Sequence, residues 1–178
     1  MGTFGRDVRA RLSGQHIMIF LTLGTQLPFD RLVQALDDVA KDLNETIYGQ
    51  IGHGTYKPAN FEADALLTPT EFSKRFEEAR VIVGHAGIGT ILSGIQAQKP
   101  LVLMARQAKH GEHRNDHQLA TVSQVRKIDG VYIVEGADDL RSVLKSTELN
   151  PMQNAASKSR ENLVTSLRNE IWEGRYSV

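Results

Sequence analysis

The segment from residue 81 to residue 98 constrains the fold of this chain more than any other. An apolar, β-branched run ends in the turn 84–90 (GHAGIGT), and a helical pattern follows at once over 91–98. A strand that passes directly into a helix through a glycine turn is typical of a parallel α/β sheet. Glycine lets the backbone approach a ligand closely, and the unpaired N–H groups at a helix start attract anions. The segment therefore predicts an α/β fold with a phosphate-facing turn.

The same alternation of apolar runs and helical patterns continues along the chain. Strands are predicted over 17–23, 45–51, 65–67, 80–83, 101–105 and 131–134. Helices are predicted over 29–43, 71–78 (with Thr70 as N-cap), 91–98, 117–127, 138–145 and 155–174. This order predicts a Rossmann-like domain over 18–150, with a parallel sheet that carries helices on both faces. Residues 1–17 lack a period and are interpreted as an extension or an expression remnant, and 151–178 as a C-terminal helical segment.

The composition argues against several classes of function. The 21 Lys and Arg residues balance 21 Asp and Glu residues, and aromatic residues make up only 6% of the chain. Neither a basic excess nor a base-stacking surface points to nucleic acid. The absence of cysteine excludes disulfides and thiolate metal sites and fits a reducing compartment. No apolar run approaches the roughly 20 residues that span a bilayer, so membrane association would need a surface or a partner.

Two glycine turns are candidates for phosphate binding, each with a plainer alternative. The turn 84–90 lacks the Gly-Lys-Ser/Thr of a P-loop and the third glycine of the dinucleotide fingerprint. His85 either donates to a phosphate or caps the following helix. Gly24 and Thr25 form a second turn after a strand, which is either phosphate-facing or a simple connection. Because both turns follow parallel strands, they are expected at the same edge of the sheet.

The segment 106–118 (RQAKHGEHRNDHQ) is the most polar part of the chain. It is either a solvated loop with Asp116 as the N-cap of the next helix, or a sugar site, because a sugar needs many amide and carboxylate partners. His110, His113 and His117 invite a metal interpretation. Gly111 argues against one regular helix across all three, and no carboxylate set completes a shell, so no metal site is predicted.

In these two segments together, the chain resembles the C-terminal, donor-binding half of family 28 glycosyltransferases, which have the GT-B fold. The likeness covers about 18–134 and is closest to stand-alone small subunits, above all those of bacterial exopolysaccharide and capsule glycosyltransferases. It also extends to the catalytic subunit of the N-acetylglucosaminyltransferase of dolichol-linked glycan synthesis. It is carried by the segments 20–25, 28–32, 49–52, 84–90, 99–100 and 111–118.

The resemblance implies a UDP-sugar donor and no cofactor. The residues that it places at UDP are Gly24, Thr25, His85, Ala86, Gly87, Gly89, Thr90 and Arg106. The residues that it places at the sugar are Glu112, Asn115, Asp116, His117 and Gln118. Relatives of the peptidoglycan type hold the ribose with a Glu on the helix after the glycine turn. Ser93 stands at that position here, so another group would have to hold the ribose.

A GT-B enzyme has two such halves, so the resemblance implies a separate, membrane-associated partner that binds a lipid-linked saccharide acceptor. The partner would carry the general base, and no catalytic residue is assigned in this chain. The expected reaction is inverting hexosyl transfer in exopolysaccharide synthesis, at the inner face of the cytoplasmic membrane. The stripe Leu163, Leu167, Ile171 and Trp172 is either the docking surface or a face packed on the chain's own sheet. The alternative functions are a non-catalytic activator that binds no donor and, less favoured, a nucleotide-binding regulator.

Overall fold

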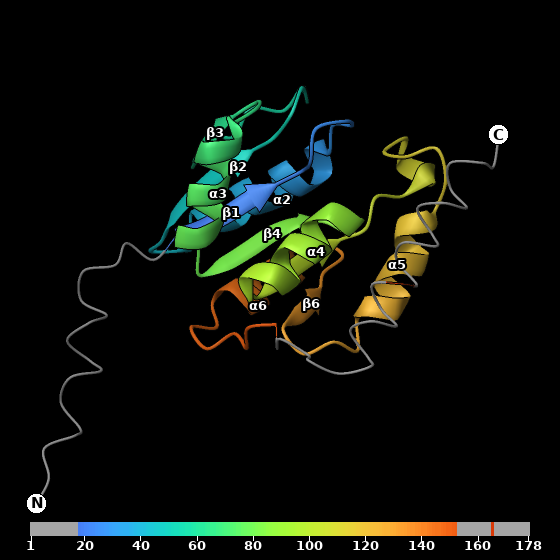
Figure 1. The fold of residues 1–178 in the computed structure, drawn as a ribbon. Helices are drawn as coiled ribbons and strands as arrows, with labels where there is room; N and C mark the ends of the chain where they lie inside the picture. The colour runs from blue at the N-terminus through green and yellow to red at the C-terminus, as the bar shows by residue number, and fades with distance from the viewer. Residues whose placement is uncertain (1–17, 153–164, 166–178) are drawn as a thin grey trace, which may run out of the picture.

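The computed structural model describes residues 18–152 and Thr165, and its centre is one sheet of six parallel strands (Figure 1). The strands are β1 (Met18–Thr22), β2 (Thr46–Gln50), β3 (Glu62–Asp64), β4 (Val81–His85), β5 (Leu101–Met104) and β6 (Val131–Ile133). Their order in the sheet is β3-β2-β1-β4-β5-β6. The predicted Rossmann-like α/β class is therefore confirmed.

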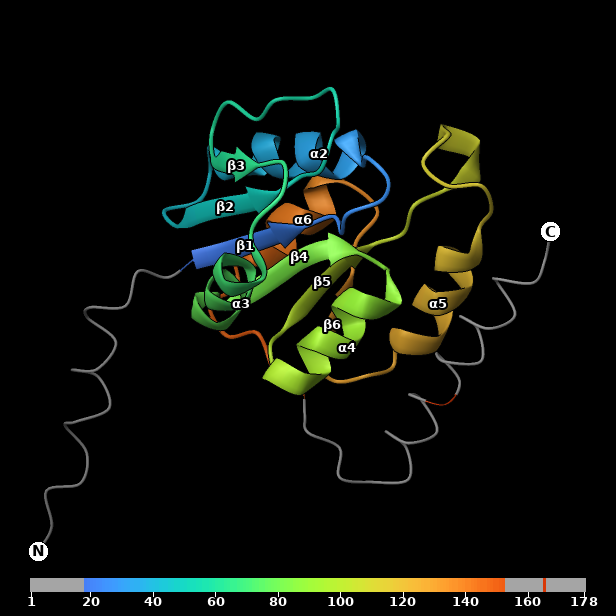
Figure 2. The same cartoon turned by 45° about the horizontal axis from the view of Figure 1, so that its top comes forward.

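Helices cover both faces of this sheet, as Figure 2 shows. The helices are α2 (Asp30–Ala40), α3 (Pro69–Glu78), α4 (Ile88–Ala97), α5 (His117–Val125) and α6 (Ala137–Leu144), with a 3-10 turn, η1, at Ala108–His110. Helices α2 and α6 pack side by side on one face, and α3, α4 and α5 pack on the other.

Alternation along the central strands explains why both faces need a cover. Ile19 and Leu21 of β1 point into the core under α2 and α6, whereas Met18 and Phe20 point into the core under α3, α4 and α5. Successive side chains of a strand face opposite sides, so a continuous apolar run must be buried on both. The strand is fully buried along its length, which the unbroken run MIFLT requires.

Two predicted elements are shifted along the chain. The edge strand lies at Glu62–Asp64 rather than 65–67, because pairing with β2 uses backbone groups and does not require apolar side chains at an edge. The apolar triplet instead follows the strand, where Leu67 donates its N–H to Gln50 Oε1. Helix α3 begins at Pro69 with Thr68 as N-cap, not Thr70, since Thr68 and Glu71 form a reciprocal capping box.

The strand order places a crevice between β1 and β4. The chain winds outward from β1 through β2 to β3, and then returns to the other side of β1 to form β4, β5 and β6. Ligands of such sheets bind beyond the carboxyl ends of the strands at this reversal. The predicted extension 1–17 lies outside the described residues, as does the predicted helix 155–174 apart from Thr165.

Candidate functional site

A cleft of about 600 Å³ opens at the reversal between β1 and β4. Its walls come from the loops after β1 and β4, the start of α4, the N-terminal half of α3, and the segment that follows β5. The polar residues that line it are Thr22, Thr25, Gln26, Gln50, Ser73, His85, Thr90, Ser93, Arg106, His113 and Gln118. No carboxylate is among the described residues that line the cleft, which therefore carries no negative side chain.

The N-terminus of α4 faces this cleft without a cap. Gly87 is the N-cap residue, no side chain of the described chain accepts from the first turn, and that turn holds no acidic residue. By contrast α2, α3 and α6 each carry an acidic residue in the first turn. The first N–H groups of a helix lack partners inside the helix and carry partial positive charge. Gly89 is exposed and an added Cβ would meet nothing within 4 Å, so the first turn of α4 is open to an anion.

A buried cation lies beside this helix start. Arg106 is 3% exposed and donates from Nη2 to the carbonyls of Leu23 (3.0 Å) and Leu27 (2.6 Å), which ties down the loop after β1. Its Nε is buried without a partner in the described structure. Burial lowers the pKa of Arg106 to about 10, and the charge of Glu112 opposes that shift, so the guanidinium stays charged at neutral pH. The site thus holds a positive charge with unused hydrogen-bonding capacity.

The imidazole of His85 fills the space between the two glycine turns. A Cβ on Gly87 would lie 2.1 Å from His85 Nε2, and a Cβ on Gly24 would lie 3.1 Å from its Cε1. Only glycine at residue 87 leaves room for this ring, and Gly24 in addition has a φ of +72°. Burial lowers the pKa of His85 to about 4, and the charge of Arg106 acts in the same direction. A hydrogen bond with the Thr22 backbone opposes this shift in pKa only in part, so the ring is neutral at pH 7.

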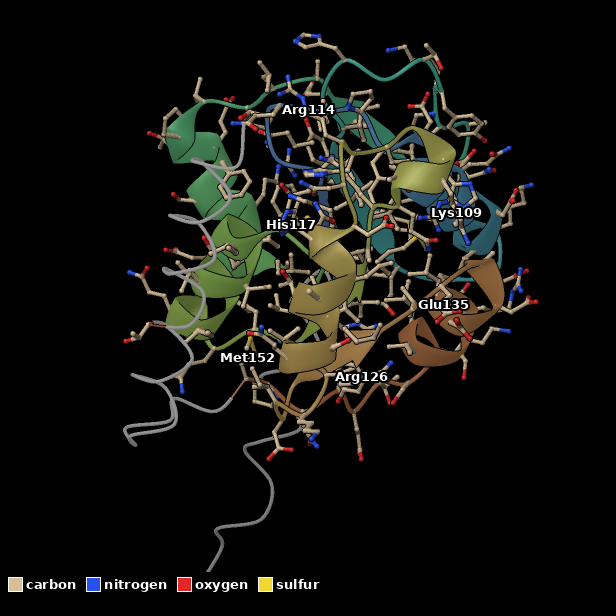
Figure 3. The ribbon with its side chains drawn as sticks, turned by 90° about the vertical axis from the view of Figure 1, so that its right-hand side faces the viewer. Lys109, Arg114, His117, Arg126, Glu135 and Met152 are labelled. Atoms are coloured by element: carbon tan, nitrogen blue, oxygen red, sulfur yellow. The ribbon has the colours of Figure 1, made fainter. Side chains whose placement is uncertain are left out.

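The polar segment after β5 forms a loop that carries two cleft residues. Gln118 is buried at the start of α5, lines the cleft and accepts the N–H of Arg106 at Oε1 (3.0 Å), and His113 also lines the cleft. Figure 3 looks onto α5 and this loop, with His117 labelled at the start of the helix. Asp116 does not cap α5 with its side chain, because Oδ1 accepts the N–H of Ala108 instead (2.8 Å).

The structure brings most of the predicted UDP residues together. Of these, the residues that line the cleft are Gly24, Thr25, His85, Gly87, Gly89, Thr90 and Arg106. Ala86 is buried behind the turn and does not line the cleft.

Only Gln118 of the predicted sugar residues lines the cleft. Asn115, Asp116 and His117 are exposed and do not line the cleft, and Glu112 bonds to Arg31 of α2.

Six polar residues of the cleft are not among the predicted site residues, namely Thr22, Gln26, Gln50, Ser73, Ser93 and His113. Gln50 ends β2 two residues before Gly52, and a glycine shortly after a strand is the same signal that identified the turns after β1 and β4. His113 was considered only as a metal ligand, although its neighbours were assigned to the sugar. Over residues 18–152, no group of three or more His, Asp or Glu residues could hold a metal ion. Within the same range no helix combines the length and apolar character that crossing a bilayer requires.

The amino-acid sequence matches a known protein family. The model of the glycosyltransferase family 28 C-terminal domain matches residues 18–171. The UDP-N-acetylglucosamine transferase subunit ALG13 of mouse is 27% identical over 119 residues, which cover 61% of this chain and 10% of the mouse protein. The human protein of the same name is 27% identical over 120 residues, with the same coverage. This chain therefore spans about a tenth of the length of the curated relatives that it matches.

Solved structures share the fold at low identity. An NMR structure of ALG13 matches with a TM-score of 0.58 at 15% identity, covering 86% of this chain and 98% of that one. MurG of Acinetobacter baumannii matches with a TM-score of 0.58 at 20% identity, covering 93% of this chain and 52% of that one. A UDP-glucose:anthocyanidin 3-O-glucosyltransferase in complex with UDP matches with a TM-score of 0.57 at 12% identity, covering 96% of this chain and 39% of that one.

Proposed function

The chain belongs to the glycosyltransferase family 28 C-terminal domain family, and from that premise we propose that it is the donor-binding subunit of a UDP-sugar-dependent hexosyltransferase. The single observation that carries the proposal is the electropositive cleft at the β1–β4 reversal. An uncapped helix start, a buried Arg106 with an unused Nε, and the absence of lining carboxylates among the described residues all favour an anion there. The relatives' names and titles agree, since they mention UDP-N-acetylglucosamine and UDP.

The charge of the residues around the cleft supports a diphosphate rather than a neutral sugar alone. Glu112 bonds directly to Arg31 in a bidentate pair, and no carboxylate among the described residues hydrogen-bonds to Arg106. A buried cation without a directly bonded counter-ion is costly, and a bound diphosphate would offset that cost. The neutral His85 offers a ring nitrogen for hydrogen bonding, without a charge of its own at pH 7.

The proposed reaction is an inverting transfer. An acceptor hydroxyl attacks the anomeric carbon of the sugar, the bond from that carbon to the β-phosphate oxygen breaks, and the acceptor loses its proton to a base on the partner. UDP departs with the bonding electrons, so negative charge grows on its β-phosphate. The helix N–H groups at Gly89 and Thr90, together with Arg106, would stabilise that charge without a metal ion. We assign the sugar to the side of the cleft that Gln118 and His113 line.

The chain would work with a second polypeptide. The family domain corresponds to one half of a GT-B enzyme, and the match to MurG covers 52% of that chain. We infer that a membrane-associated partner supplies the other half, the general base and the site for a lipid-linked saccharide, in exopolysaccharide synthesis. The chain would then lie peripherally at the inner face of the cytoplasmic membrane through that partner.

Calorimetric titration with UDP, with ADP as the control nucleotide, tests the donor assignment. The intact chain should bind UDP and not ADP, and Gly87→Val should lose binding because the new side chain collides with His85 while the sheet is unchanged. Circular dichroism would check that the variant is folded. Equal binding of UDP by Gly87→Val and the wild type would refute the placement of the diphosphate.

The alternative function is a non-catalytic activator that binds no donor. It predicts that neither nucleotide binds the chain, alone or with its partner, and that the partner alone retains UDP binding. The open helix start and the unpartnered Nε of Arg106 in the described structure favour the donor-binding function over this one.

A further inference from the structure

The guanidinium of Arg31 donates to three residues that are far from it in the sequence, namely Ala105 and Glu112 of the loop that follows β5, and Glu135. Its Nε and Nη2 donate to the two carboxylate oxygens of Glu112 at 2.7 and 2.8 Å. Nη2 also donates to the carbonyl of Ala105 (2.9 Å), and Nη1 donates to the carbonyl of Glu135 (3.3 Å). Since Arg31 lies on α2, this one side chain ties the base and the middle of the loop to the opposite face of the sheet.

The carboxylate of Glu112 completes the attachment from the other side. Its Oε2 accepts the N–H of Gln107 (3.0 Å), and its side chain is only 9% exposed. Burial alone would raise the pKa of Glu112, but the hydrogen bonds from Arg31 and from the Gln107 amide lower it overall. Glu112 is therefore charged at neutral pH, and the bidentate geometry with Arg31 is the strong form of such a pair.

The same cluster continues to the cleft through one aromatic ring. The guanidinium carbons of Arg31 and Arg106 each lie 5.2 Å from the ring centroid of Phe29, which is fully buried. Arg31 and Glu112 do not line the cleft, whereas His113, directly after Glu112, does. A change in the pair would thus reach the cleft through the loop and through Arg106, and not by contact with a ligand.

We propose that the Arg31–Glu112 pair is a positioning device that holds loop 105–116 against the cleft and thereby sets the affinity for the nucleotide donor. This inference rests on the proposed function, because the ligand is the UDP of the donor. Without the pair, His113 and the start of α5 would no longer be held at a fixed distance from the N-terminus of α4. The ligand would then have to order loop 105–116 when it binds, and the free energy of that ordering would lower its affinity.

The chain contains a matched control for this pair. Arg80 and Glu45 form another bidentate pair (2.5 and 2.6 Å), and Arg80 also donates to the carbonyls of Leu144 and Ser146. The side chains are similarly half-buried, at 18% and 16% exposed against 27% and 9% for Arg31 and Glu112. Arg80 directly precedes β4 and Glu45 directly precedes β2, so this pair lies at the edge of the sheet opposite the cleft.

The experiment compares Glu112→Gln with Glu45→Gln in the full chain. Melting temperature should fall in both variants. We expect UDP affinity, measured by calorimetry, to fall about tenfold or more in Glu112→Gln and to change less than twofold in Glu45→Gln. Hydrogen exchange of the ligand-free chain should accelerate at the amides of Gln107 and Ala108 in Glu112→Gln only. If Glu112→Gln does not fold, Arg31→Lys replaces it, because lysine keeps the charge but cannot form the bidentate contact.

The affinity and exchange measurements test separate parts of the proposal. Equal UDP affinity in the two variants overturns the positioning role, and unchanged exchange in the loop overturns the attachment itself. Failure of the wild type to bind UDP, alone and with its partner, refutes the proposed function, and with it the effect on affinity. The exchange measurement needs no ligand, so it still decides whether the pair holds the loop.

Discussion

Replacing Gly89 by Asp should make the protein more stable and at the same time abolish most of its UDP binding. The residue lies in the first turn of α4, is exposed, and has nothing within 4 Å of an added Cβ, so the carboxylate enters without a clash. An acidic side chain in a first turn interacts favourably with the helix dipole, and the loss of a helical glycine adds a similar gain. Together these contribute about 0.5 to 1 kcal/mol, or an increase of about 1 to 4 °C in Tm.

The expected change in the free energy of UDP binding is unfavourable and larger than the gain in stability. A carboxylate about 5 Å from a bound phosphate, at an effective dielectric constant of about 20, costs about 3 kcal/mol per pair of unit charges. That energy corresponds to a loss of about two orders of magnitude in affinity. The new carboxylate would also compete for the N–H groups that we assign to the diphosphate.

Calorimetric titration with UDP and a thermal unfolding scan measure the two effects on the same samples. Gly89→Asn is the matched control, because its side chain has the same size without the charge. It should keep most of the affinity and gain less stability. If Gly89→Asp bound UDP as tightly as the wild type while still raising Tm, the helix start would not be the anion site, and the reasoning would be refuted.

Two further predictions concern stability. The pKa of His85 is lowered from 6.5 to about 4, so between these values the unfolded chain binds a proton that the folded chain does not, and stability falls as pH falls through this window. The loss is at most about 3 kcal/mol, and chemical denaturation at pH 7 and pH 4.5 should show a clearly smaller loss for His85→Gln; the same slope in both proteins would contradict this prediction. Separately, Asp37→Asn should destabilise the chain by about 2 to 4 kcal/mol, because the 3% exposed carboxylate accepts from Tyr56 Oη and from the amides of Ala59 and Asn60. Its UDP affinity should stay within twofold of the wild type, since Asp37 does not line the cleft, and a large loss of affinity would show that this cluster is coupled to the site.

The fold was predictable because its strongest signals are local. The run from Met18 to Thr22 needs burial on both faces, and the turn at Gly87 leads directly into α4, so a parallel sheet with helices on both sides followed from the sequence. The edge strand was harder to place. Strand β3 is held by backbone pairing to β2, and such pairing leaves no mark on the pattern of side chains.

The candidate site was predictable where the backbone forms it and less so where tertiary contacts do. Glycine turns mark the loops after β1 and β4, and both of these loops line the cleft. By contrast, the partner of Glu112 is 81 residues away on α2, and no local pattern connects Glu112 with Arg31. Gln118 is likewise held at the cleft by the backbone N–H of Arg106, which donates to its side chain. The sequence predicted that each of these two residues faces a ligand, but not that they contact each other.

The position of β1 in the sheet has a consequence for how this chain folds. β1 is the first strand of the described chain, yet it lies inside the sheet between β2 and β4, and β4 begins only at Val81. Because every pairing is parallel, no hairpin can form early, and each contact must wait for a loop or helix to close. A nascent chain that ends before β4 therefore exposes one hydrogen-bonding edge of a largely apolar strand, which is a template for association with other chains. Ribosomal pausing before β4, or truncation there, should consequently increase the demand for chaperones far more than truncation after β5.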